Sequence, residues 1–88
     1  MEYYPETIAL FKEILKKNFP KLKGEKDDVR TDKPAHLLWM LDQIKSLKGI
    51  GKRGRWIGHV NGALVSKKLL DNRKSRETIK RDVANGCE

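Results

Sequence analysis

The basic side chains are the residues of this sequence whose chemistry points most clearly to a function. The 88-residue chain carries 20 Lys and Arg against 12 Asp and Glu, a net charge of +8. The excess lies in residues 45–82, which hold twelve basic and three acidic side chains, whereas residues 1–44 hold eight of each. A concentrated positive potential attracts polyanions, and nucleic acid is the most abundant polyanion in a cell. The alternative is a charged surface that only keeps a small protein soluble.

Catalytic and metal-binding chemistry find little support. The histidines His36 and His59 fall in different predicted helices, with no acidic or cysteine partner at ligand spacing. The acidic cluster within residues 25–32 lacks the glycine and carboxylate spacing of a calcium loop, so we expect a solvated loop there. No nucleophile–base pattern and no phosphate-cradling glycine motif is present. The sequence therefore predicts a protein that is not an enzyme and uses no metal or cofactor.

A glycine-containing turn offers the most specific candidate site. Residues 47–54, Leu-Lys-Gly-Ile-Gly-Lys-Arg-Gly, resemble the hairpin of helix-hairpin-helix DNA-binding modules. The resemblance implies that backbone amides at the start of the following helix contact a phosphate, as helix N-termini generally can. Arg55 departs from the family pattern, which usually has a small residue there, and a chance glycine-rich turn is the alternative. The residues expected at this site are Lys48, Gly49, Gly51, Lys52, Arg53 and Arg55.

A second likeness lies near the end of the chain. Residues 75–83, Ser-Arg-Glu-Thr-Ile-Lys-Arg-Asp-Val, look like the recognition helices of bacterial helix-turn-helix repressors, which implies a helix that enters the major groove. Residues 67–74 lack the small residue and the turn glycine of that motif, so an ordinary amphipathic terminal helix is the favoured interpretation. Auxiliary phosphate contacts are expected from Arg73, Lys74, Arg76 and Lys80.

Helices are the elements that must position these side chains. Apolar residues recur at helical spacing, and Asp32 and Ser75 are suitable N-caps for the second and fourth helices. Ile79 and Val83 supply the apolar positions of the fourth helix. No segment alternates long enough for a strand. We predict an all-α, compact bundle of about four helices, at residues 5–18, 33–48, 52–66 and 75–84.

The whole chain, residues 1–88, is expected to form one small domain. Residues 21–33 have no apolar period and read as an exposed connection. The single Cys87 cannot form an internal disulfide, and no apolar run approaches the length of a membrane span. These features predict a cytoplasmic protein with no membrane partner.

Three glycines, Gly54, Gly58 and Gly62, recur every four residues in the third predicted helix. Each costs about 1 kcal/mol of helix propensity relative to alanine, which indicates a constraint. The favoured interpretation is tight packing against a neighbouring helix, with Trp39 laid across the groove. The alternative is a bare strip that receives a ligand or a phosphate backbone.

Residues 34–83 are similar as a whole to small uncharacterised phage and prophage proteins of enteric bacteria. The segments Pro-Ala-His-Leu-Leu-Trp-Met-Leu at 34–41 and Arg-Trp-Ile-Gly-His-Val-Asn-Gly at 55–62 carry this likeness. This resemblance implies an accessory role in a bacterial host cell, and it identifies no active-site residues.

Two functions follow from these patterns. The first is non-catalytic binding of nucleic acid, with DNA favoured, through the basic second half of the chain. Such binding should be weakly sequence-selective and should weaken steeply with salt. The alternative is a protein-binding accessory factor, such as an inhibitor or adaptor of an acidic host protein, with Trp39, Tyr3 and Tyr4 as aromatic anchors.

Overall fold

Four α-helices make up the protein in a computed structural model that describes residues 2–88. Helix α1 spans Pro5–Asn18, α2 spans Pro34–Gln43, α3 spans Ile50–Ser66 and α4 spans Asn72–Ala84. A short 3-10 helix, η1, at Ile44–Ser46 follows α2 directly. No strand occurs within residues 2–88. The predicted all-α bundle of about four helices is confirmed.

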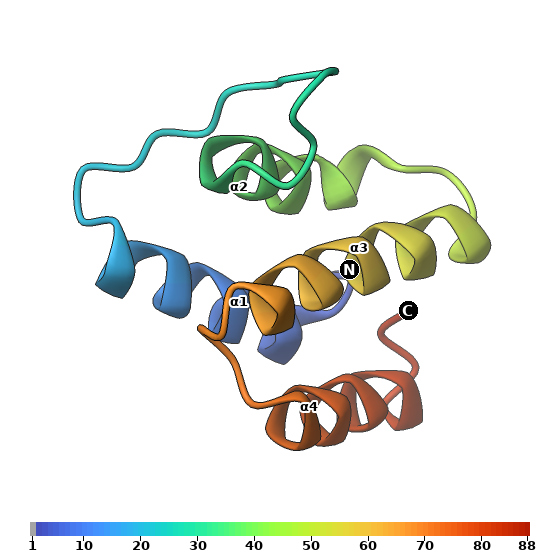
Figure 1. The fold of residues 1–88 in the computed structure, drawn as a ribbon. Helices are drawn as coiled ribbons and strands as arrows, with labels where there is room; N and C mark the ends of the chain where they lie inside the picture. The colour runs from blue at the N-terminus through green and yellow to red at the C-terminus, as the bar shows by residue number, and fades with distance from the viewer. Residues whose placement is uncertain (1) are drawn as a thin grey trace.

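The helices pack in a closed ring. Helices α1 and α3 each contact both α2 and α4. In Figure 1, α2 lies above the pair α1 and α3, and α4 lies below it. The two ends of the chain meet, because the backbone N–H of Tyr4 donates to the carbonyl oxygen of Cys87 at 2.6 Å. The apolar core is built mainly from α1, α2 and α3; its fully buried large side chains are Phe11, Leu15, Leu37, Ile44, Ile57, Val60 and Leu64.

The middle helices differ from their predicted bounds. Residues 33–48 were predicted as one helix, but the α-helical part ends at Gln43 and the chain tightens into η1. The N-cap of α2 is Lys33, without a side-chain capping bond, so the predicted cap Asp32 is wrong. Helix α3 begins two residues earlier than predicted, directly after Gly49, whose φ of 100° is accessible to glycine at little cost.

The fourth helix also begins earlier than predicted. The Asp71 carboxylate accepts a hydrogen bond from the backbone N–H of Arg73 at 2.9 Å and caps the helix. Ser75, the predicted cap, therefore lies inside the helix, where its hydroxyl donates to the carbonyl oxygen of Asn72 at 3.0 Å.

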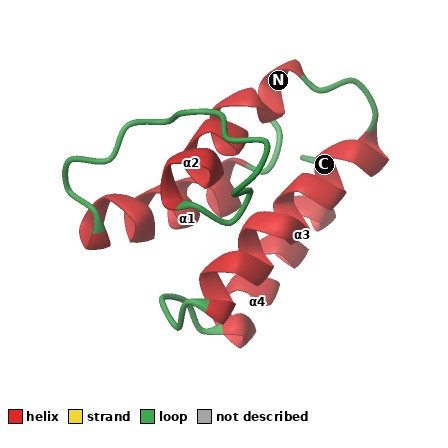
Figure 2. Cartoon of the chain, turned by 45° about the horizontal axis from the view of Figure 1, so that its top comes forward, coloured by secondary structure: helices red, strands yellow, loops and turns green. Residues whose placement is uncertain are grey.

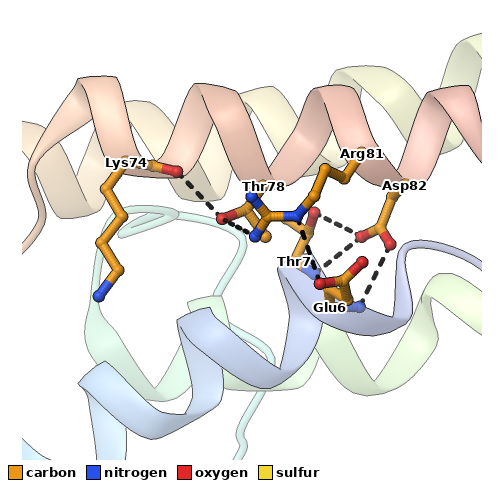
Figure 3. Close-up of polar contacts among 6 residues, drawn as sticks. All are labelled: Glu6, Thr7, Lys74, Thr78, Arg81 and Asp82. Atoms are coloured by element: carbon orange, nitrogen blue, oxygen red, sulfur yellow. Dashed lines mark hydrogen bonds and ion pairs between the residues drawn. The ribbon is translucent and has the colours of Figure 1, made fainter.

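The inner face of α4 is polar. Its buried residues are Ser75, Thr78 and Asp82, whereas Val83, predicted as an apolar inward position, is 39% exposed. The reason is visible in Figure 3, where Asp82 points at the first turn of α1. Its carboxylate accepts hydrogen bonds from the backbone N–H and the hydroxyl of Thr7, at 2.8 and 2.7 Å. The register of α4 is therefore set by a polar contact between the two ends of the chain.

The long connection between α1 and α2 folds back along α2, as Figure 2 shows. The backbone N–H of Glu25 donates to the carbonyl oxygen of Ala35 at 3.0 Å. A Cβ atom added to Gly24 would lie 3.2 Å from the backbone nitrogen of Trp39, so a side chain at this position would crowd the backbone of α2. Most of residues 21–33 are exposed, as predicted, but the segment is held against α2 by specific contacts.

Candidate nucleic-acid interface

The turn between η1 and α3 is open to solvent. Lys48, Gly49, Gly51 and Lys52 are all exposed, and Ile50 between the two glycines is 56% exposed. The first backbone amides of any α-helix have no partner within the helix. The turn that was predicted to bind phosphate is therefore accessible to solvent, and its lysines Lys48 and Lys52 are exposed beside it at the start of α3.

Arg53 does not belong to this exposed set. Only 6% of the residue is accessible, and its guanidinium lies 3.7 Å from the ring centroid of Tyr3. Its Nε donates to the carbonyl oxygen of Glu88 and its Nη1 to that of Leu47, both at 2.8 Å. The prediction that Arg53 contacts phosphate is wrong, because its donors join the start of α3 to the end of the chain.

A groove lies between α2, α3 and the long connection, and we call it the aromatic groove. Its volume is about 740 Å³. Trp39 from α2 and Trp56 from α3 form its aromatic wall, with ring centroids 5.8 Å apart and an interplanar angle of 41°. Lys52 and Arg55, two of the predicted nucleic-acid contacts, line the same groove. Residues assigned to the two competing functions thus meet at one site.

Two lysines lie over the indole rings of the groove. The ammonium of Lys26 is 5.6 Å from the ring centroid of Trp39, and that of Lys52 is 5.8 Å from the ring centroid of Trp56. Both distances fall within the range of cation–π attraction. The π-faces of both tryptophans can therefore be reached by a charged group from the groove side.

Histidines hold the rim of the groove in place. The backbone N–H of Asp27 donates to Nδ1 of the buried His36 at 2.9 Å. On the other wall, Nε2 of His59 lies 2.9 Å from the carbonyl oxygen of Thr31, and since a carbonyl oxygen only accepts, the histidine donates. Both imidazoles line the groove and tie the connection to α2 and α3.

A local turn completes this rim. The backbone N–H groups of Arg30 and Val29 donate to the carboxylate of Asp27 at 2.9 and 3.0 Å. Both hydrogen bonds lower the pKa of Asp27 below its ordinary value, and the bond from Arg30 has the larger effect. The turn presents Asp28 and Thr31 to the groove.

The auxiliary cations on α4 form a separate group. Arg73, Arg76 and Lys80 surround a shallow hollow with Asn72 and Glu77. Lys74 is exposed but does not line this hollow. The basic residues of the second half therefore occupy at least two places, the start of α3 and the outer side of α4.

Few of these cations are neutralised by carboxylates. Within residues 2–88, only Lys67 and Arg81 of the twelve basic side chains in 45–82 form ion pairs, with Asp32 and Glu6 respectively. Arg53 is buried against carbonyl groups. The remaining nine form no ion pair with the residues described: Lys45, Lys48, Lys52, Arg55, Lys68, Arg73, Lys74, Arg76 and Lys80.

The glycine stripe of α3 is not a packing surface. A Cβ atom added to Gly58 or Gly62 would meet nothing within 4 Å, and one added to Gly54 would lie 3.6 Å from the hydroxyl of Tyr4. Trp39 packs against Trp56 and His36, with centroids at 5.8 and 5.3 Å, and not across the glycines. The favoured interpretation of the stripe, close helix packing beneath Trp39, is therefore wrong.

The three predicted aromatic anchors do not form one surface. Tyr4 is 4% exposed, so its prediction as a displayed anchor is wrong; its aromatic ring belongs to the core cluster. Tyr3 is partly buried and stacks with Arg53. Trp39 alone lines the aromatic groove.

Sequence reasoning missed two members of the groove. Trp56 was not among the predicted site residues, and Lys26 falls in the segment predicted as an exposed connection. A signal was present for Trp56, because it directly follows Arg55 and falls one turn after Lys52. No local signal marks Lys26, since its position depends on how the connection folds back over α2.

Comparisons with protein-family models, curated proteins and solved structures gave no match to this chain. Residues 2–88 contain no group of three or more His, Cys, Asp or Glu side chains placed to hold a metal ion. In the same part of the chain, no helix has the length and apolar character needed to cross a bilayer. The helix-hairpin-helix, repressor-helix and phage-protein resemblances remain predictions.

Proposed function

We propose that this protein binds nucleic acid through the aromatic groove and the adjoining turn at the start of α3. The observation that carries the proposal is the position of Lys52 and Arg55. Both are exposed, neither is paired with a carboxylate within residues 2–88, and both line a groove with two tryptophans. Cations beside aromatic rings are typical of surfaces that bind a phosphate backbone and its bases.

The charge balance of the groove supports an anionic ligand. Three cations line it, Lys26, Lys52 and Arg55, against one carboxylate, Asp28. That carboxylate lies 3.7 Å from the ammonium of Lys26. Lys52 and Arg55 are therefore available for phosphate, with Lys48 exposed on the turn just before them.

A titration of a fluorescently labelled oligonucleotide, followed by anisotropy at several salt concentrations, tests this function. The matched variants each remove two exposed cations: Lys52→Gln with Arg55→Gln at the groove, and Lys16→Gln with Lys17→Gln in the last turn of α1. Figure 1 shows that this turn and the start of α3 lie on opposite sides of the molecule.

The groove variant should weaken binding and should reduce the slope of log affinity against log salt by about 1.5, because two phosphate contacts are lost. The α1 variant should retain most of the affinity. Absence of binding by the unmodified protein at low salt, or equal losses in both variants, would contradict the proposal.

Protein binding is the second candidate function, and the accessible Trp39 in a cationic groove is the observation in its favour. An acidic peptide should then compete for the same site. Capture from a host lysate with and without nuclease distinguishes the two, because a nucleic-acid complex is lost on nuclease treatment and a protein complex is retained.

A further inference from the structure

We infer that the aromatic groove binds an unpaired base, so that the ligand is single-stranded nucleic acid and not duplex. This inference rests on the proposed function and specifies its ligand. It depends on the indole rings of the groove, whereas the function itself depends on the cations.

Part of the surface of each tryptophan ring is not covered by the fold and is available for stacking. Both are only partly buried, and their rings are tilted by 41° to each other, so neither ring fully covers the other. Trp39 also contacts the tilted ring of His36, with centroids 5.3 Å apart. The ammonium ends of Lys26 and Lys52 lie over Trp39 and Trp56 respectively. These ends are flexible and can move from ring to phosphate when a base stacks, because every base has a π-face and every nucleotide carries an anion.

The size of the groove favours a nucleotide over a double helix. Its volume of about 740 Å³ is in the range of small-molecule sites, about 300–1,000 Å³. In a duplex the π-faces of the bases are already stacked, and a base must be extruded at a cost before it can enter such a site. An unpaired base avoids most of that cost.

Polar groups in the groove can meet the edge of a base. The half-buried side chain of Gln43 lines the groove and has no hydrogen-bond partner among residues 2–88. An amide offers both donors and an acceptor, which suits the mixed edges of bases. Lys52 and Arg55 on the α3 side can then hold the attached phosphate.

Intrinsic fluorescence provides the test, because the chain has two tryptophans and both line this groove. Three ligands of equal length, about ten nucleotides, are titrated at one low salt concentration: oligothymidylate, an abasic strand with the same phosphates, and a duplex. Oligothymidylate should quench the emission and bind about tenfold more tightly than the abasic strand and the duplex.

The outcomes separate the inference from the proposed function. If all three ligands bind equally and the emission does not change, the protein binds nucleic acid by charge and the base-stacking inference is wrong. If none binds, the proposed function fails with it. A polyglutamate that quenches as strongly as oligothymidylate would also overturn the inference, because a base would not be needed.

A pair of variants locates the stacking contact. Trp56→Leu should weaken binding of oligothymidylate by about tenfold, whereas Trp56→Phe, which keeps an aromatic face, should lose less. The loss for the abasic strand should be smaller than the loss for oligothymidylate in both variants. Equal losses for the two strands would assign Trp56 a structural role, and the three-ligand comparison on the unmodified protein does not depend on how well these variants fold.

Discussion

The carboxylate of Asp82 is one of several groups that join the two ends of this chain. Helix α1 has no side-chain cap of its own, since its N-cap residue, Tyr4, makes none. Asp82 of α4 supplies the cap instead and accepts from the N–H groups of Thr7 and Glu6, at 2.8 and 3.4 Å. An anion at this position also compensates the positive end of the helix dipole. One buried residue thus fixes the start of α1 and the packing face of α4.

Replacement of Asp82 by alanine should lower the free energy of unfolding by about 3 kcal/mol, because it leaves buried donors of α1 and the Thr7 hydroxyl without an acceptor. Asp82→Asn retains an oxygen acceptor and should lose less. Chemical denaturation measures both, with the exposed Glu77→Ala on the same helix as control. A loss in Asp82→Ala no larger than in the control would contradict the capping role.

We expect Tyr4 to make the stability of the protein sensitive to alkaline pH. Burial, and then the negative charge of Glu88, raise the pKa of its phenol above the ordinary value of 10.0. The phenol therefore ionises in the unfolded chain at a lower pH than in the folded one. Its contribution to stability is complete below pH 10 and is lost as the pH rises through the folded-state pKa.

The measurement is the difference in free energy of unfolding between the unmodified protein and Tyr4→Phe as a function of pH. This difference should be constant below pH 10 and should shift against the unmodified protein above it. A difference that stays constant across the alkaline range would contradict the assignment.

Helix α3 presents the binding residues on one side and, on another, glycines that pack against no other part of the protein. Its buried residues Ile57, Val60 and Leu64 face the core, and Lys52 and Arg55 face the groove. Gly58 and Gly62 lie open to solvent, where glycine has no packing role to offset its cost in helix propensity.

Gly58→Ala and Gly62→Ala should each stabilise the protein by about 0.5–1 kcal/mol, since alanine restricts the unfolded chain and meets no atom in the folded one. Thermal unfolding checks this, with Gly24→Ala as a contrasting variant that should destabilise because of its approach to the backbone of α2. Destabilisation by the two α3 substitutions would show that the stripe is in contact with something.

The sequence predicts the positions of the helices well, but it does not predict every face that they bury. The first helix has its predicted bounds, because apolar spacing and Pro20 are local signals. The inner face of α4 could not be predicted, since the partner of Asp82 lies 75 residues away along the chain. Arg53 escaped prediction for the same reason, as its acceptors come from Leu47 and from Glu88, 35 residues on.

Most of the charged side chains of the molecule lie at its surface, and Arg53 and Asp82 are buried exceptions. Nine cations of the second half form no ion pair with residues 2–88, and they lie chiefly at the start of α3 and on α4. The sequence predicted the excess charge and several of the residues that display it. It could not show that Lys52, Arg55 and Trp39 share one groove, because that depends on how α2, α3 and the long connection pack.

Binding of single-stranded nucleic acid in the aromatic groove is tested most directly by a nuclear magnetic resonance titration of the isotope-labelled protein with oligothymidylate. If the strand binds in the aromatic groove, the indole N–H signals of Trp39 and Trp56 and the backbone amides at the start of α3 should shift together. The amides in the last turn of α1 should stay unchanged. Shifts confined to α4, or indole signals that do not move at saturation, would contradict the aromatic groove as the binding site.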